Sequence, residues 1–241
     1  MTVRCLVMLA IGIIPLFFMS VGAQATDQTS QCKWDFPWPR TVYYYIDTTP
    51  GHFTSSEATR VSYGPNTWSE GGFNLKFTRV YNKTSATYYR PPRENYYYYT
   101  TVQKGFVSND PLASAAAYVM DSTGAVHYIT STSSCNRDAG RPIRQVTTVF
   151  NTNTNFYLDC KSAFSHCNAN DLVDIHNTSS HEFGHWFFLG HTGSNYVSDT
   201  MYRTSGFGEW TKRDLASHDW TSARAMYGCR AGYGGTYCYA N

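Results

Sequence analysis

Three histidines and one glutamate have the types and spacing for metal-dependent chemistry. His181 and His185 are four residues apart, and Glu182 lies between them. At about 3.6 residues per turn, a helix places residues four apart on the same face. Two neutral imidazoles so placed can bind one zinc ion, and a carboxylate beside them can take a proton from a water at that ion. The run therefore predicts a hydrolytic metal site.

A third histidine, His191, follows six residues after His185. That spacing is too long for His191 to share the same face of a continuing helix. Gly190 directly precedes it, and glycine gives a chain a place to leave a helix. We expect His191 to swing back as a third ligand. Three protein ligands leave a fourth zinc position for water, which is typical of a catalytic zinc.

The run from 181 to 191 resembles the metzincin signature, and its surroundings resemble the matrixins, the matrix-metalloproteinase-like endopeptidases. Residues 199–202, Asp-Thr-Met-Tyr, are similar to the Met-turn of that clan. Residues 215, 219 and 226–228 match the spacing of its closing helix. The motif His-Glu-x-x-His alone recurs by chance on helices with partly buried histidines. The third histidine and the Met-turn favour the metal site over that alternative.

The resemblance implies a secreted zinc metalloendopeptidase. His181, His185 and His191 would bind the zinc, and Glu182 would act as the general base that later protonates the leaving amine. Met201 would form a hydrophobic floor beneath the metal without being a ligand. The family also allows calcium, but no clear ligand set for calcium stands out in this sequence.

The sequence departs from the family pattern at two places. Phe188 stands where the family usually has glycine. Either Gly190 carries the turn two residues later or the third-ligand geometry is altered, and we expect the first. After Met201, residues 202–205 do not match the usual wall of the specificity pocket, so the resemblance predicts no cleavage preference. Asp219 either supports the Met-turn or is a solvated helix acid, and both interpretations stay open.

The first 25 residues are typical of a secretion signal. Arg4 precedes an apolar run over 6–21, and Ala23-Gln24-Ala25 provides a cleavage site. An uncleaved membrane anchor is the alternative, because the run approaches spanning length. We predict a signal peptide at 1–25, a short segment at 26–40 and a matrixin-like catalytic domain at 41–241. The protein is therefore expected to be extracellular.

Seven cysteines become six once Cys5 leaves with the signal. An even number in an oxidising compartment predicts three disulfides. We propose the pairs Cys160–Cys167, Cys229–Cys238 and Cys32–Cys135, out of fifteen possible pairings. Cys32 could instead cap the zinc, but it lacks the sequence motif of such a switch.

The predicted elements agree with an α+β protein. Strands are expected at 41–46, 75–80 and 145–151, and a β-hairpin at 115–120 and 125–130. A helix capped at Thr54 or Ser55 should be disturbed at Gly64-Pro65 and end at Gly71-Gly72. The zinc helix should begin near Asn170 or Asp171. The resemblance implies a zincin fold, in which a mixed twisted sheet carries the zinc helix, and a small lower subdomain after the third histidine ends in a C-terminal helix.

Composition limits the partners. A formal net charge of +2 gives no argument for nucleic acid or an anionic membrane. The resemblance implies a monomer that binds a peptide substrate along an edge strand of the hairpin region. Tyrosines gather over 81–105 and form either a glycan- or protein-binding surface or locally packed rings. Two alternative functions stay open: Phe188 leaves room for a zinc-binding pseudoenzyme, and the tyrosine cluster for a secreted glycan- or surface-binding protein.

Overall fold

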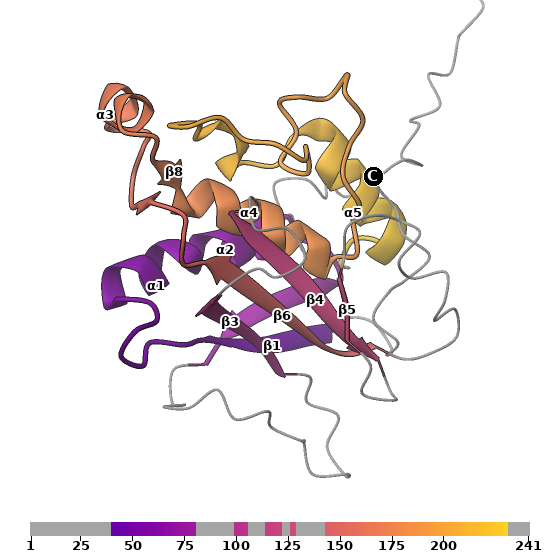
Figure 1. The fold of residues 1–241 in the computed structure, drawn as a ribbon. Helices are drawn as coiled ribbons and strands as arrows, with labels where there is room; N and C mark the ends of the chain where they lie inside the picture. The colour runs from indigo at the N-terminus through magenta and orange to yellow at the C-terminus, as the bar shows by residue number, and fades with distance from the viewer. Residues whose placement is uncertain (1–39, 81–98, 106–113, 122–125, 129–142, 231–241) are drawn as a thin grey trace, which may run out of the picture.

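A computed structural model of the chain describes residues 40–80, 99–105, 114–121, 126–128 and 143–230 (Figure 1). The predicted signal peptide, Cys32, Cys135, Cys238 and most of the tyrosine-rich region lie outside these residues. Among the helices that the structure describes, none is long and apolar enough to cross a bilayer.

A six-stranded mixed sheet forms the base of the fold. Its order is β2-β1-β3-β6-β4-β5. The strands are β1 (Arg40–Ile46), β2 (Leu75–Arg79), β3 (Tyr99–Gly105), β4 (Ala115–Asp121), β5 (Val126–Tyr128) and β6 (Ile143–Asn151). β1, β2, β3 and β6 are parallel, whereas β4 is antiparallel to both β6 and β5. The predicted hairpin and the mixed character of the sheet are confirmed.

The predicted N-terminal helix is divided in two, α1 (Ser55–Val61) and α2 (Tyr63–Glu70). Thr54 and Glu57 form a capping box at the start of α1. Pro65 has no N–H to bond to the Val61 carbonyl, and the Ser179 hydroxyl donates to that carbonyl at 2.5 Å instead. The disturbance predicted at Gly64-Pro65 is therefore confirmed, and its break falls at Ser62.

The second half of the chain holds α3 (Phe164–Ala169), α4 (Ile175–Trp186), the 3₁₀ turn η1 (Thr211–Arg213) and α5 (Ser217–Tyr227), with short paired strands β7 (Phe156–Tyr157) and β8 (Val173–Asp174). The Cys160–Cys167 disulfide is confirmed. Cys229 is disulfide-bonded as well, and the predicted partner Cys238 lies outside the described residues.

The predicted start of the zinc helix is wrong by about one turn. Asp171 has φ 53°, a left-handed conformation that cannot continue into a helix. Residues 173 and 174 then pair with β7 as a strand. Helix α4 begins only at Ile175, with Asp174 as its N-cap.

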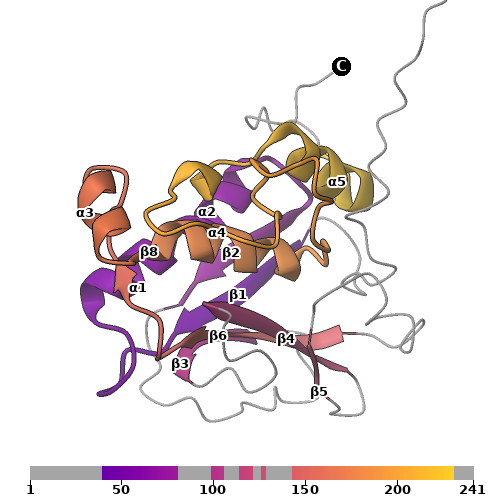
Figure 2. The ribbon, with the colours of Figure 1, turned by 45° about the horizontal axis from the view of Figure 1, so that its top comes forward.

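Aromatic side chains fill the space between the sheet and α4. Tyr44 and Phe77 from the sheet meet Phe183 of α4 edge-to-face, at ring-centroid distances of 5.3 and 5.8 Å. Trp186 and Trp68 are also fully buried. Figures 1 and 2 show α4 between the sheet and the segment that carries α5. Replacing one such buried ring by alanine typically lowers the free energy of unfolding by about 3–5 kcal/mol, so this layer holds α4 firmly in place.

Candidate metal centre

The carboxylate of Asp174 fixes the beginning of α4. It accepts a hydrogen bond from the Asn177 backbone N–H at 2.8 Å and another from the Cys160 backbone N–H at 2.8 Å. It also pairs with the Arg213 guanidinium, whose Nε lies 3.0 Å away. A buried carboxylate needs such partners to stay charged. The N-terminal end of α4 is thereby joined to η1, beyond the Met-turn.

The first two imidazoles are oriented through their Nδ1 atoms. Nδ1 of His181 lies 2.7 Å from the carbonyl oxygen of Thr200, and Nδ1 of His185 lies 2.8 Å from that of Leu189. A carbonyl oxygen can only accept, so each Nδ1 carries the hydrogen. The Nε2 atom of each ring keeps its lone pair. Metal-binding histidines are commonly held in this way.

Helix α4 ends in a left-handed turn at Phe188. The Phe188 N–H donates to the His185 carbonyl at 2.9 Å, and the Leu189 N–H donates to the Gly184 carbonyl at 3.2 Å. These two bonds form a Schellman motif, whose left-handed position is usually glycine. Phe188 occupies it with φ 56° and a fully buried side chain. The prediction that Gly190 carries this turn is therefore wrong.

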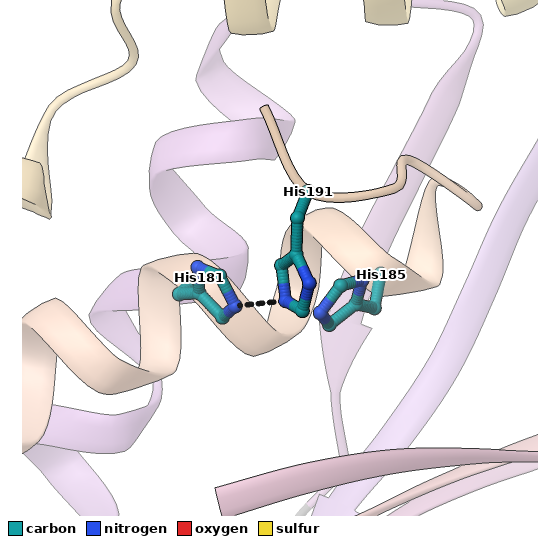
Figure 3. Close-up of side chains that lie close together, drawn as sticks. All are labelled: His181, His185 and His191. Atoms are coloured by element: carbon teal, nitrogen blue, oxygen red, sulfur yellow. Dashed lines mark hydrogen bonds between the residues drawn. The ribbon is translucent and has the colours of Figure 1, made fainter. Parts of the chain in front are cut away.

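The turn returns His191 to the face of α4 that carries the other two histidines (Figure 3). Nε2 of His191 lies 3.3 Å from Nε2 of His181. One nitrogen from each of the three rings lies within 4.8 Å of the others. Tetrahedral zinc with ligands at about 2.0–2.1 Å separates its nitrogens by about 3.3–3.4 Å. The three imidazoles could therefore hold one metal ion, and they form the only such cluster among the described residues.

Burial keeps these imidazoles neutral at physiological pH. It lowers the pKa of His181 to about 3, with a smaller effect from His191. Burial and then the other two imidazoles hold the pKa of His185 well below its usual value. Burial lowers the pKa of His191 to about 4, and the positive charge of Arg203 contributes further. Neutral rings have a lone pair ready for a cation.

Glu182 is buried beside this cluster without a partner for one of its oxygens. Its side chain is 4% exposed, and among the described residues Oε2 has no hydrogen-bond partner. Burial raises the pKa of Glu182 to about 8. A nearby cation would favour the charged carboxylate, and a water could supply the missing hydrogen bond. The orphaned oxygen therefore fits a site that takes both a metal ion and a water.

Asp219 holds residues 199–202, the segment that resembles a Met-turn, against α4. Its buried carboxylate accepts hydrogen bonds from the backbone N–H groups of Thr200 at 2.8 Å and Met201 at 3.2 Å. Met201 packs so closely on Gly184 that a Cβ added there would lie 2.0 Å from the Met201 sulfur. Of the two interpretations of Asp219, support of the Met-turn is the one confirmed. Because Thr200 also orients His181, Asp219 acts on the metal centre from a distance.

No sequence motif signals the groups that support the cluster. The orienting carbonyls of Thr200 and Leu189 are backbone atoms, so no side-chain motif signals them. The buried cations Lys212 and Arg213 look like surface residues in the sequence. Lys212 pairs with Glu209, three residues earlier, whereas the partner of Arg213 is Asp174, 39 residues away. His176 lies outside this cluster and packs against the Tyr63 ring at a centroid distance of 5.3 Å.

Comparison with protein-family models and with curated proteins gives no match to this chain. Among solved structures, the chain is similar to the structure of myroilysin, with a TM-score of 0.39 and 12% sequence identity. The likeness covers 84% of this chain and 98% of that one. A likeness of this level carries no statement about activity.

Proposed function

We propose that this protein is a zinc-dependent endopeptidase. The observation that carries the proposal is the convergence of three imidazole nitrogens beside the buried carboxylate of Glu182. Three nitrogen ligands suit zinc and leave a position for a reactant. Within this class, the motifs of the sequence favour a metzincin of the matrixin type. We propose that the protein is exported after loss of residues 1–25.

Each residue of the site has a separate role in the proposed peptide hydrolysis. When bound, zinc supplies a Lewis acid that polarises a peptide carbonyl and acidifies a water. Glu182 takes the proton of the attacking water at its carboxylate and delivers it to the nitrogen of the leaving amine. Thr200 and Leu189 hold His181 and His185 in one tautomer through their carbonyls. Met201, buried against Gly184 of α4, gives the centre an apolar floor in this proposal.

The sheet offers an edge for the polypeptide substrate. Among the described strands, β2 and β5 form the two edges of the sheet, and β5 pairs with residues 118–120 of β4. Residues 115–117 pair on their other side with β6. We propose that a substrate strand adds to β4 at residues 115–117, through main-chain hydrogen bonds that require no particular sequence.

Cleavage of casein by zinc-loaded protein, with and without a chelator, tests the proposal. We expect cleavage that stops on chelation and returns with about one zinc per chain. Glu182→Gln should keep the zinc and lose about 10²–10⁴-fold in turnover, because it removes the general base without changing the shape of the site. Glu70→Gln makes the same chemical change on an exposed side chain and should leave turnover unchanged.

Two results would contradict the proposal. Unchanged turnover in Glu182→Gln would remove that residue from the chemistry. Full zinc loading without cleavage of casein or of other unfolded proteins would favour a zinc-binding pseudoenzyme.

A further inference from the structure

A buried lysine anchors the loop that follows the Met-turn, residues 202–206. Lys212 is 1% exposed although it carries a charge. Its ammonium group donates to the carbonyl oxygen of Thr204 and lies 5.1 Å from the centre of the Tyr202 ring. Glu209 is its counterion, with Oε1 3.1 Å from Nζ. A buried charge with these partners fixes the path of the loop.

The ion pair of Lys212 and Glu209 also holds the far end of the loop, at Gly206. The second oxygen of Glu209 accepts a hydrogen bond from the Gly206 backbone N–H at 2.8 Å. At the near end, residue 202 forms a parallel bridge with Thr192, the residue after the third histidine. The Thr192 N–H also donates to the Met201 carbonyl at 3.0 Å. The loop is therefore attached at one end to the metal centre and at the other to Lys212.

Arg203 lies in this loop, one residue beyond the bridge to Thr192. Its side chain is exposed, and within the described part of the chain no hydrogen bond or ion pair engages its guanidinium. Its charge is close enough to His191 to contribute, after burial, to the low pKa of that imidazole. Glu209 balances the charge of Lys212, whereas no described carboxylate forms an ion pair with Arg203. Among the described residues, the guanidinium of Arg203 thus has no partner, and it belongs to a loop that is bridged to the residue after the third histidine.

We propose that Arg203 is a specificity-determining residue that selects polypeptides with an aspartate or glutamate beside the scissile bond. A guanidinium is a planar fork of donors that matches a carboxylate with two parallel hydrogen bonds. A glutamine of the same length offers no charge to pair with it. This inference rests on the proposed peptidase activity, because it names the class of substrate that the site prefers.

The test begins with the cleavage sites of zinc-loaded protein on casein, mapped by mass spectrometry. The best site is then made as two peptides that differ only in glutamate or glutamine beside the cleaved bond. For the wild-type protein we expect kcat/KM to be at least about tenfold higher for the glutamate peptide, as charge-assisted hydrogen bonds typically give. Arg203→Gln should bring this ratio close to one, and Arg203→Glu should invert it.

Arg224→Gln is the matched control. Arg224 is exposed on α5, and its replacement makes the same change in net charge. Arg224→Gln should keep the wild-type ratio of kcat/KM between the glutamate and glutamine peptides. This result would separate a direct contact by Arg203 from a general effect of net charge. Unfolding midpoints of all variants should agree, because both arginine side chains lie at the surface.

The outcomes for the two proposals are distinct. Cleavage without preference for the acidic peptide, or a preference that survives Arg203→Gln, overturns the role of Arg203 and leaves the peptidase intact. If the wild-type protein cleaves nothing, the peptidase proposal fails and no cleavage site defines the peptides. One casein segment is then made with either glutamate or glutamine at its centre, and the binding of these two peptides to zinc-loaded protein is measured by fluorescence anisotropy. Tighter binding of the acidic peptide that disappears in Arg203→Gln then supports the recognition of acidic chains, and equal binding refutes it.

Discussion

Replacing Phe188 tests the backbone turn that brings His191 to the other two histidines. We compare Phe188→Gly with Phe188→Ala, and we use the same two changes at Phe187 as the matched control. Both phenylalanines are fully buried, but φ is 56° at Phe188 and −81° at Phe187. Each of the four variants should lose about 3–5 kcal/mol of unfolding free energy with its ring.

The two sites should rank alanine and glycine in opposite orders. At position 188 the left-handed conformation lowers the free energy of unfolding of the alanine variant by about 1–2 kcal/mol, whereas glycine adopts this conformation without strain. Glycine loses about 0.5–1 kcal/mol in backbone entropy relative to alanine. Phe188→Gly should therefore be more stable than Phe188→Ala by about 0.5–1 kcal/mol. At Phe187, alanine should be the more stable by about 0.5–1 kcal/mol.

Urea unfolding of chelator-treated protein with intact disulfides gives these differences. The comparison of glycine with alanine at one position cancels the loss of the ring, so it isolates the backbone. If alanine were the better residue at both positions, the left-handed turn at Phe188 would be wrong. Gly190 would then be the residue to examine next.

Two further predictions concern the surroundings of the cluster. Asp219→Asn should weaken zinc binding by about 10–100-fold, as loss of a supporting hydrogen bond typically does, because one acceptor for the backbone N–H groups of Thr200 and Met201 is lost. Competition with a chelating dye measures the zinc affinity, and Asp214→Asn, at an exposed position, is the control. Equal zinc affinities of the two variants would refute the link between Asp219 and the metal centre. Burial lowers the pKa of His176 to about 4. The unfolded state therefore takes up the proton of His176 more readily than the native state does. The free energy of unfolding of metal-free protein should then fall as the pH drops from about 6.5 to 4. His176→Leu should reduce this slope by up to about 1.4 kcal/mol per pH unit in urea titrations, and an unchanged slope would exclude His176 as a contributor.

The sequence predicts those parts of the fold that depend on local pattern. The strand at residues 41–46, the hairpin and the interrupted N-terminal helix follow from β-branched runs, turn residues and a proline, and all three are present. The clustering of His181, His185 and His191 follows from helical spacing plus one turn. These features need only a few neighbouring residues to be recognised.

The features that the sequence did not predict depend on distant contacts. Helix α4 begins late because β8 pairs with β7, about 17 residues earlier in the chain. Phe188 takes a left-handed conformation that glycine usually takes, because the core buries its ring. Sequence reasoning on neighbouring residues includes only the steric cost of that conformation. Arg213 is buried because it pairs with Asp174, 39 residues away. Each of these needs the folded partner before it can be inferred.

X-ray absorption at the zinc edge tests the metal centre most directly. Protein loaded with one zinc should show three imidazole nitrogens at about 2.0–2.1 Å and one oxygen at a similar distance. His191→Ala should lose one imidazole from this shell. A sulfur at about 2.3 Å, or a wild-type shell with fewer than three imidazoles, would contradict a catalytic zinc held by His181, His185 and His191.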